Sequence, residues 1–327
     1  MPSRRDSPAG CDSDAGHTEE AAEFVALRPL LFSLAYQMTG GVADAEDIVS
    51  EAYLRLRRAE ANGTRIDSLK NYLSSVVTRL SIDQLRSARS RREAYVGTWL
   101  PEPLIESAST PEFERVELAD TLSMAFLVLL ETLTPTERAV FLLREVFEFD
   151  YPQISRMLDK SEPYCRQLLS RARQHVDARK PRFDANNGDR DQLTASFFTA
   201  LEDGDLDPLI TMLAADVVAY GDGGNGPSLP RPVDGRDKVL RLLTAVSRAA
   251  ADHQLHFERV LVNGQPGALF VDGDGLLLNV IALDVVDGVI QTVRSIVNPD
   301  KLAHIGPLIS EDHPLRGGGR RSARSRR

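Results

Sequence analysis

Residues 133–176 read LTPTERAVFLLREVFEFDYPQISRMLDKSEPYCRQLLSRARQHV, and their helix-start signals form the strongest structural pattern in the chain. Thr134 occupies an N-cap position, Pro135 follows at the first helical position, and Glu137 completes a capping box. This pattern predicts a helix that runs through residue 147. Asp150 and Gln153 repeat the capping box, so a second and shorter helix is expected to follow.

A third helix is predicted after a turn at Asp159-Lys160, because Ser161 can cap it. Its inward face carries apolar residues at helical spacing, namely Cys165, Leu168 or Leu169, Ala172 and Val176. Three helices joined by tight turns predict a helix-turn-helix. The outward face carries side chains that could reach base edges and phosphates in a DNA major groove, namely Tyr164, Arg166, Gln167, Ser170, Arg171 and Gln174. The alternative is an ordinary solvated face.

The rest of the chain divides by pattern into further segments. Helical periodicity over 22–93 predicts a bundle of helices, and the Pro-rich segment 94–115, with its single Trp99, predicts a linker before helices resume over 116–184. Residues 188–305 change to helices followed by Val-, Ile- and Leu-rich strands, and Asp287-Gly288 is a hairpin signal. We therefore expect a C-terminal α+β domain with a curved antiparallel sheet. Residues 1–21 and 311–327 have almost no apolar content and predict disordered tails.

Composition excludes several classes of protein. The chain has 327 residues, 42% hydrophobic and 27% charged, which is typical of a soluble multidomain protein. Its longest apolar run, 124–130, is far below the roughly 20 residues that cross a bilayer, and the N-terminus lacks a signal-peptide core. We therefore expect no membrane contact and a cytoplasmic location. Two cysteines give neither a disulfide framework nor a zinc site.

The basic residues gather in two clusters although the net charge is −9. One cluster holds Arg86, Arg89, Arg91 and Arg92, and the other holds Arg166, Arg171, Arg173, Arg179, Lys180 and Arg182. Segregated basic patches favour nucleic-acid binding. The alternative is a pair of solvated helix ends that complement the helix dipole.

Four motifs in this order resemble the extracytoplasmic-function (ECF) sigma factors of RNA polymerase. They are DAEDIVSEAYLRL at 44–56, LKNYL at 69–73 with IDQLR at 82–86, LTPTER at 133–138, and the segment 161–173. The resemblance covers about 160 residues. It implies that the first helical domain binds the clamp of the polymerase beta-prime subunit and opens the minus 10 promoter element, while the helix-turn-helix reads the minus 35 element. At the turn before the recognition helix, Asp159 stands where relatives often have Gly.

The resemblance assigns these roles residue by residue. Core-polymerase binding falls to Asp44, Glu46, Asp47, Glu51 and Leu54, although acidic residues at a helix start are also explained by the helix dipole. DNA binding falls to Asn62, in the loop that captures an unstacked base, and to Arg79, Asp83, Arg86, Arg89, Tyr164, Arg166, Gln167, Arg171 and Arg173. A flipped base loses stacking energy that such a loop must replace.

The C-terminal part resembles the SnoaL-like cone of the nuclear transport factor 2 type, and the whole chain resembles the SigJ-type subgroup of ECF sigma factors, in which this cone regulates activity. The resemblance implies regulatory roles for Trp99, Leu100, Pro101, Glu102 and Pro103 in the linker, for Asp222, Gly223 and Gly224, and for Asn298, Pro299, Asp300, Lys301 and Leu302. After Gly224, Asn225 and Gly226 depart from the subgroup pattern. We expect Trp99 and the segment 298–302 to form one contact.

The same cone hosts enzymes, so catalysis must be weighed. Asp216 or Asp222 with Tyr220, His253 or His256 could in principle transfer a proton, but no spacing pairs an acid with a base. We therefore expect no catalytic residue, no cofactor and no metal. The alternative function is a one-component DNA-binding regulator with a ligand-binding or catalytic cone. Whether the cone holds an unknown small ligand stays open.

Overall fold

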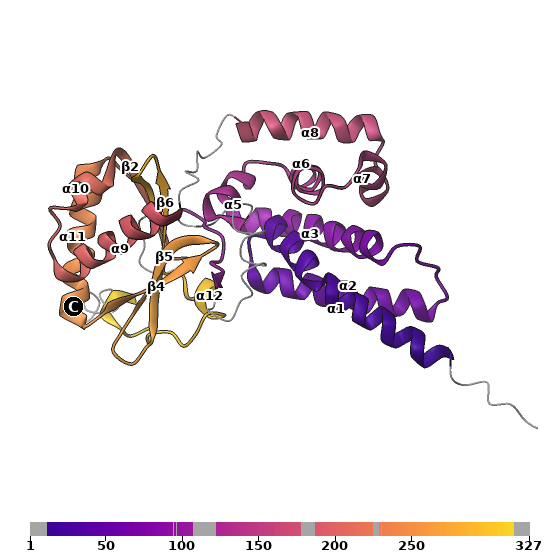
Figure 1. Ribbon diagram of the computed structural model, residues 1–327, viewed down its shortest axis with the longest axis horizontal. Helices are drawn as coiled ribbons and strands as arrows, with labels where there is room; N and C mark the ends of the chain where they lie inside the picture. Colours follow the sequence, from indigo (N-terminus) through magenta and orange to yellow (C-terminus); the bar gives the residue numbers. More distant parts are fainter. Residues whose placement is uncertain are drawn as a thin grey trace, which may run out of the picture.

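The computed structural model describes residues 12–93, 95, 97–106, 122–177, 187–224, 229 and 231–316. The N-terminal helical domain consists of α1 (Asp12–Thr39), α2 (Val42–Ala61) and α3 (Leu69–Glu93). The predicted apolar positions Ile48, Ala52 and Leu56 are buried along one side of α2. They pack against α1 and α3, as the helical periodicity predicts (Figure 1).

The helix-turn-helix domain follows with α5 (Met124–Leu130), α6 (Pro135–Phe141), η1 (Leu142–Val146), α7 (Tyr151–Leu158) and α8 (Glu162–Asp177). Both predicted capping boxes are present, at Thr134 with Glu137 and at Asp150 with Gln153. η1 is a π-helical turn that carries the first helix on to residue 146, so this prediction is confirmed. Asp159 ends α7 in the left-handed conformation, at φ 53°, which a glycine adopts without strain, and this gives the tight turn before α8.

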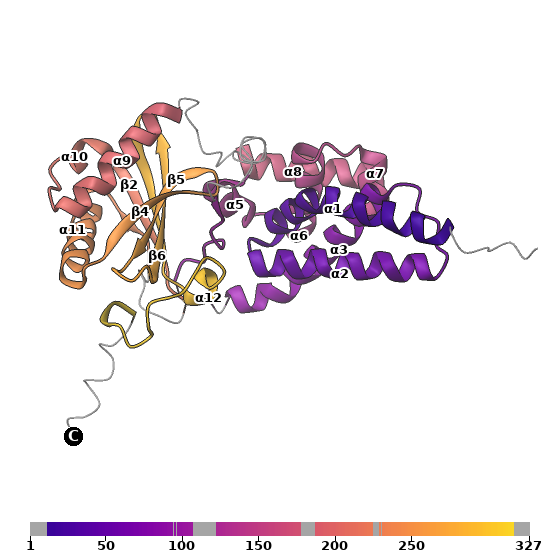
Figure 2. The same cartoon turned by 60° about the horizontal axis from the view of Figure 1, so that its bottom comes forward.

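These two helical domains share a hydrophobic core. Apolar residues of α1, α2 and α3 form one buried cluster with those of α6, α7 and α8. In both ribbon views α3 lies beside the helix-turn-helix domain (Figures 1 and 2), and its contacts with α7 and α6 account for this packing. The two domains are therefore held together along α3.

The C-terminal domain packs helices on one face of a sheet. The helices are α9 (Asn187–Asp203), α10 (Leu209–Met212) and α11 (Arg236–His253), with the short α12 (Pro299–Leu302) and η2 (Pro314–Arg316) further along the chain. The strands are β2 (Leu213–Asp222), β3 (Val233–Asp234), β4 (His256–Val262), β5 (Gln265–Val271), β6 (Leu277–Val286) and β7 (Val289–Ile296). Between helix α9 and the sheet, the rings of Phe197, Phe198, Phe257 and Phe270 form a chain of contacts in the core.

With β1 (Ile105–Glu106) at one edge, the sheet order is β1-β4-β5-β6-β7-β2-β3, and two of its features correct the sequence analysis. β2 pairs with β7 in parallel, so the α+β fold is confirmed but the sheet is mixed rather than wholly antiparallel. β1 (Ile105–Glu106) comes from the predicted linker and pairs antiparallel with β4, so part of that linker is an edge strand of the sheet. At the hairpin, Asp287 and Gly288 both have positive φ, as a type I′ turn requires.

The predicted tails also need correction. α1 begins at Asp12, so residues 12–21 are helical rather than part of a tail, and residues 1–11 lie outside the described ranges. Residues 311–316 are described too, and the Arg316 guanidinium donates a hydrogen bond to the Leu277 carbonyl at 3.3 Å. Residues 317–327 lie outside the described ranges. Among the helices that are described, none combines the length and apolar character needed to cross a membrane.

Candidate functional sites

The five residues predicted to bind polymerase all lie on α2. Asp47, Glu51 and Leu54 follow one another at helical spacing along one face, and Leu54 is 49% exposed. Glu51 pairs with Arg55 at 2.9 Å, and this hydrogen bond lowers the pKa of its carboxyl. Asp44 instead accepts a hydrogen bond from Gln84 at 2.7 Å, and Glu46 pairs with Arg28. The face that is open to a partner is therefore the Asp47 to Leu54 side.

The start of α2 is capped by a residue from the linker. Gly41 stands at the N-cap and has no side chain to offer, but Glu102 accepts hydrogen bonds from the amides of Val42 at 2.7 Å and Ala43 at 3.4 Å. The Glu102 amide in turn donates to the Gly40 carbonyl at 2.8 Å. Burial raises the pKa of the Glu102 carboxyl, which these two amides oppose. The linker thus completes the first turn of the predicted polymerase helix.

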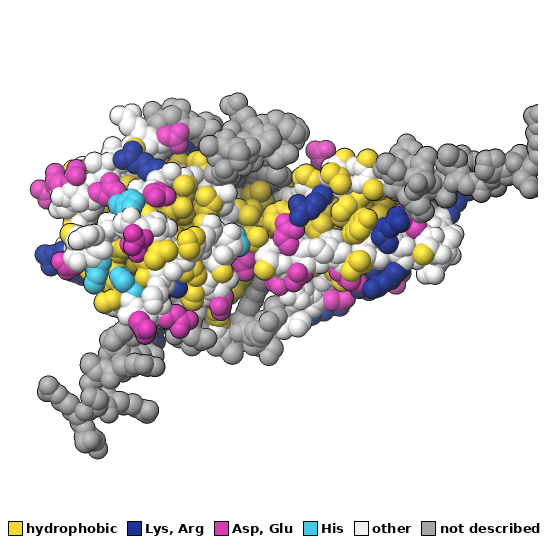
Figure 3. Space-filling view, turned by 90° about the horizontal axis from the view of Figure 1, so that it is seen from below, with side chains coloured by type: hydrophobic (Ala, Val, Ile, Leu, Met, Phe, Trp, Pro, Cys, Tyr) yellow, Lys and Arg dark blue, Asp and Glu magenta, His cyan; other side chains and the backbone are white. Residues whose placement is uncertain are grey.

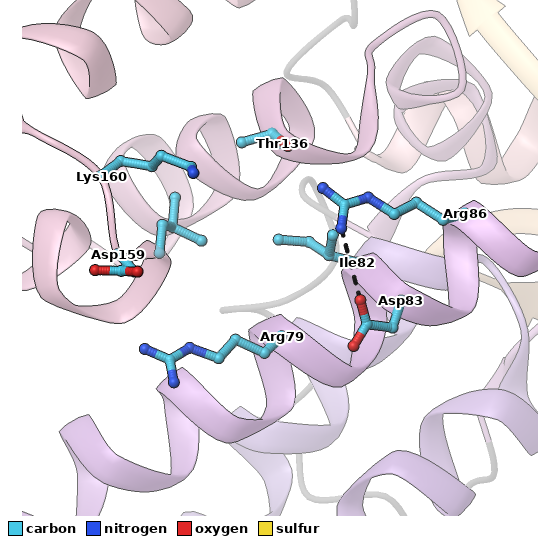
Figure 4. A pocket seen from close by; sticks show the side chains of 8 residues that line it. Arg79, Ile82, Asp83, Arg86, Thr136, Asp159 and Lys160 are labelled. Atoms are coloured by element: carbon cyan, nitrogen blue, oxygen red, sulfur yellow. Dashed lines mark ion pairs between the residues drawn. The ribbon is translucent and has the colours of Figure 1, made fainter.

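Three of the predicted minus 10 residues lie on α3 against the helix-turn-helix. Arg79 donates to the carbonyls of Met157 at 2.8 Å and Arg156 at 3.2 Å, at the end of α7. Asp83 and Arg86 pair at 3.7 Å. Across a pocket of about 500 Å³ they face Thr136, Asp159 and Lys160 (Figure 4).

The two other predicted residues of this group lie apart. Asn62 is exposed at the end of α2, where its backbone amide caps the helix. The Arg89 side chain lies outside what the structure describes.

The predicted recognition helix, α8, presents the predicted outward face to solvent. Its inward residues Cys165, Leu168, Leu169, Ala172 and Val176 are all buried, as predicted. Tyr164, Arg166, Gln167, Arg171 and Arg173 are exposed on the other side. Arg166 pairs with Glu162 at 3.0 Å, and Arg173 pairs with Glu145 at 2.8 Å. This face is accessible to a DNA groove.

The predicted regulatory residues converge on one buried carboxylate, that of Asp222, which ends β2. Its side chain is 0% exposed and accepts hydrogen bonds from the Leu100 amide at 2.7 Å and from the Lys301 ammonium at 2.7 Å. The Tyr95 hydroxyl donates to its other oxygen. Burial and the neighbouring Asp222 carboxylate raise the pKa of Tyr95. Lys301 also donates to the Leu100 carbonyl, so the C-terminal domain binds both the amide and the carbonyl of this one linker residue.

Aromatic rings and an amide complete this cluster. The Lys301 ammonium lies 4.2 Å from the centre of the Trp99 ring and 5.3 Å from that of Tyr95. Asn298 caps α12 and donates to the Tyr95 hydroxyl at 2.9 Å. Gly224, at φ 58°, lies so close that a Cβ there would come within 2.8 Å of the Asn298 side chain. We call Tyr95, Trp99, Leu100, Asp222, Asn298 and Lys301 the linker clasp.

Most of the remaining predicted regulatory residues lie close to the linker clasp, but the side chain of Asp300 does not join it. Leu302 is buried in a small core with Leu100, and the Pro103 carbonyl contacts the His304 ring nitrogen at 2.9 Å. Pro101 lies beside Gly40. Gly223 follows Asp222, and Pro299 opens α12. Asp300 is exposed, so the structure does not bring its side chain into the linker clasp.

Trp99 also contacts the N-terminal helical domain, where a second joint exists that sequence reasoning missed. A Cβ added at Gly40, in the turn between α1 and α2, would lie 2.8 Å from the Trp99 ring. Nearby, Asn263 donates to the Tyr36 hydroxyl at 2.8 Å, and its side-chain oxygen accepts from the Leu104 amide at 3.1 Å. Tyr36 is fully buried, which raises its pKa. Helical domain, linker and sheet therefore meet at this point.

The residues considered for catalysis do not assemble. Asp222 is occupied in the linker clasp, and Asp216 is bound to Gln291 at 2.9 Å on the exposed side of β2. His253 contacts the His313 ring, and His256 lies 3.6 Å from Glu258. Histidine side chains are visible at the surface of this domain (Figure 3). The described residues contain no group of three or more His, Cys, Asp and Glu side chains that could hold a metal ion.

Comparisons with known proteins agree with this organisation. The family model "Sigma-70 region 2" matches residues 24–91, "Sigma-70, region 4" matches residues 123–176, and "SnoaL-like domain" matches residues 194–293. The ECF RNA polymerase sigma factor SigJ of Mycobacterium tuberculosis strain H37Rv is 39% identical over 293 residues, which cover 86% of this chain and 93% of that protein. The probable ECF RNA polymerase sigma factor SigI of the same strain is 33% identical, over 88% of this chain and 96% of that protein.

A solved structure extends the likeness to three dimensions. The crystal structure of the Mycobacterium tuberculosis ECF sigma factor SigJ superposes with a TM-score of 0.70 at 34% identity, and the match covers 90% of this chain and 100% of that one. The chain therefore belongs to the ECF RNA polymerase sigma factors, which bind RNA polymerase and promoter DNA in transcription initiation and are not enzymes, and it carries a C-terminal SnoaL-like domain.

Proposed function

We propose that the Asp47 to Leu54 side of α2 binds the clamp of core polymerase, that α3 and Asn62 open the minus 10 element, and that α8 reads the minus 35 element. The exposed Leu54 supports the first role, because an apolar side chain flanked by carboxylates suits a protein interface. The donor-rich exposed face of α8 supports the last. Binding of residues 22–93 to core polymerase would separate this function from a one-component regulator, which needs no polymerase.

We further propose that the C-terminal domain regulates these steps in cis. The observation that carries this proposal is the Asp222 carboxylate, which belongs to the C-terminal domain but holds the linker amide of Leu100. Two residues further along, Glu102 of the same linker caps α2. A path of direct contacts therefore leads from the C-terminal domain to the helix assigned to polymerase.

The physical basis of this regulation is a helix cap supplied from outside the helix. An N-cap hydrogen bond stabilises a helix by roughly 0.5–2 kcal/mol. When the linker leaves its place, α2 loses the Glu102 carboxylate and Gly41 cannot replace it. A docked linker thus stabilises the first turn of α2, and a released linker weakens it.

Promoter binding also requires the two helical domains to separate. Arg79 is engaged with the end of α7, so the free chain cannot offer this guanidinium to minus 10 DNA. When the domains part, Arg79 exchanges two backbone carbonyls for DNA phosphates. The contact between α3 and α7 is therefore part of the regulation.

Run-off transcription with core polymerase tests the whole proposal. The full chain is compared with a form that ends near residue 185 and a form that ends after Arg316, because Leu315 still packs on the C-terminal core. We expect the full chain to initiate, removal of the C-terminal domain to alter initiation, and removal of the tail to matter less. Initiation that is identical with and without the C-terminal domain would refute cis regulation.

Trp99→Ala is expected to weaken core-polymerase binding by about fivefold, the size of a typical coupling free energy. The ring lies between Lys301 and the Gly40 turn, so its loss loosens the linker that carries Glu102. Trp99→Phe is the matched control, because it keeps an aromatic face at the same place and should retain most of the affinity. Unchanged affinity in Trp99→Ala, with both domains still folded by thermal melts, would mean that this contact is not regulatory.

Arg166→Ala is expected to lose roughly 1–3 kcal/mol of discrimination at one base pair of the minus 35 element. Arg166 lies on the exposed face of α8, where its guanidinium can form a bidentate contact with a base. Initiation from a promoter library randomised in this element measures the preference at each position. A uniform loss across all sequences would instead make Arg166 a phosphate contact.

A further inference from the structure

Tyr151, which no motif singles out, lies at the first turn of α7 and faces the recognition helix. Its ring centre is 4.6 Å from the Arg166 guanidinium carbon and 5.3 Å from that of Arg144. Its backbone is fixed by the capping box of Asp150 and Gln153, and its side chain packs against the shared helical core. A rigid aromatic ring thus stands beside the arginine assigned to base reading.

This arrangement suits an arginine that must present the N–H edge of its guanidinium to a base. A guanidinium stacked on a ring uses its π face and leaves the N–H groups of its edge free to form paired hydrogen bonds with a guanine. Glu162, on the same helix, accepts a hydrogen bond from Nη2 of Arg166 at 3.0 Å, which limits the motion of the side chain further. To form paired hydrogen bonds with a guanine, Arg166 uses its other N–H groups or exchanges this carboxylate for the base. An exposed arginine otherwise loses considerable rotamer freedom when it binds, and a side chain that is already held loses less.

Arg144 is held in a related way. It donates to the Phe149 carbonyl at 3.0 Å, so it is fixed to the turn just before α7 and lies against the same ring. The ring of Tyr151 therefore links the turn before α7 to the reading side chain of α8. Arg166 is the more exposed of the two arginines and the one on the recognition helix.

We propose that Tyr151 is a positioning residue, which holds the Arg166 guanidinium in the orientation that reads one base pair of the minus 35 element. This inference rests on the proposed function of Arg166. It adds a specificity-determining residue that itself touches no base. The ring face, and not the hydroxyl, carries the effect.

The test uses the full chain with core polymerase and a promoter library randomised over the minus 35 element. The variants are Tyr151→Leu, Tyr151→Phe, Arg166→Ala and the double variant Tyr151→Leu/Arg166→Ala. Tyr151→Leu should lower discrimination about two- to fivefold, the range expected for one exposed cation–π contact, at the position that Arg166→Ala identifies. Preferences at other positions should stay as they are. Tyr151→Phe should behave as the unchanged chain, and the double variant should lose no more than Arg166→Ala alone.

Each other outcome overturns the proposal in a distinguishable way. If Tyr151→Leu lowers initiation equally for all sequences, or adds a loss to Arg166→Ala, the ring is structural only. Thermal melts of Tyr151→Leu and Tyr151→Phe identify a folding defect as the cause. If Arg166→Ala lowers initiation equally for all sequences, Arg166 does not read a base, and the positioning role of Tyr151 is refuted as well. If Arg166→Ala changes the preference at one base pair but Tyr151→Leu does not, the role of Arg166 stands and only the positioning role of Tyr151 is refuted.

Discussion

Asp222→Ala is expected to open the linker clasp, with an increase of about a hundredfold in amide hydrogen exchange at Glu102 and Leu104. The substitution leaves the Lys301 ammonium, whose side chain is only 8% exposed, without its carboxylate. Breaking a buried ion pair on one side costs about 3–5 kcal/mol. The Leu100 amide and the Tyr95 hydroxyl lose their acceptor as well. Because these bonds all lose their partner at once, opening of the linker at Leu100 is the expected way to rehydrate Lys301.

Glu102 and Leu104 are suitable reporters because neither amide binds Asp222 itself. Their partners are the Gly40 carbonyl and the Asn263 side chain, on two other parts of the molecule. Hydrogen exchange followed by mass spectrometry measures both amides in peptides chosen so that the Leu100 amide, which binds Asp222 directly, does not contribute to the signal. Core-polymerase affinity should fall in parallel, since Glu102 caps α2 only while the linker is docked.

Two further variants serve as controls for this prediction. Asp216→Ala removes a carboxylate from the same strand, but one that is exposed and far from the linker in its contacts, with Gln291 as its side-chain partner, so exchange in the linker should not change. Asp222→Leu combined with Lys301→Met removes both charges, and replacement of a buried pair by apolar residues is often close to neutral. Part of the lost protection should return. If Asp222→Ala leaves the linker protected, Asp222 does not hold it.

The parts of this structure that the sequence predicts are those determined by neighbours along the chain. The capping box at Thr134 involves residues three positions apart, and so does the one at Asp150. The buried face of α8 follows from helical spacing alone. The hairpin at Asp287-Gly288 needs only two residues with positive φ. Such signals survive in any tertiary context, because their hydrogen bonds and dihedral angles are local.

The missed parts depend on distant partners. β2 is mostly apolar without a regular alternation, and one of its two neighbours in the sheet is β7, which lies far along the chain and runs parallel to it. Asn263 looks like an ordinary hairpin residue, yet it binds Tyr36, 227 positions away. β1 is two residues long and exists because the β4 edge is there to pair with it.

The residues of the linker clasp could be predicted only in part. Asp222, Asn298 and Lys301 are expected as regulatory residues because their motifs resemble those of related chains, and the structure brings them together around the linker. Tyr95 has no motif to mark it, and it enters the clasp only because Asp222 and Asn298 both reach its hydroxyl. Family resemblance can therefore name the participants of a joint, whereas the hydrogen bonds that connect them follow from the fold.

Cross-linking α3 to α7 is expected to abolish initiation at promoters that need both elements, with a loss of about tenfold or more. The side-chain amides of Asn71 and Gln153 lie 3.4 Å apart across this contact. Cysteines at both positions, joined by a short bifunctional maleimide, would fix the helical domains as they are. The minus 35 and minus 10 elements are about 25 base pairs apart, which is about 80 Å of duplex. Domains that share one hydrophobic core cannot reach both.

Matched controls separate this effect from the chemistry of modification. The same cysteine pair before cross-linking gives the reference activity, because Gln153→Cys also removes part of the capping box at Asp150, and the loss is measured against this reference. Cys11→Ser removes a competing thiol, while Cys165 is buried. A second pair, Asp216→Cys with Gln291→Cys, joins β2 to β7 within the C-terminal domain, where the side chains are 2.9 Å apart. Cross-linking this pair should leave initiation unchanged, because it restrains no movement between domains. Full activity of the α3 to α7 cross-linked chain would mean that promoter binding needs no separation, and that Arg79 reads DNA without leaving α7.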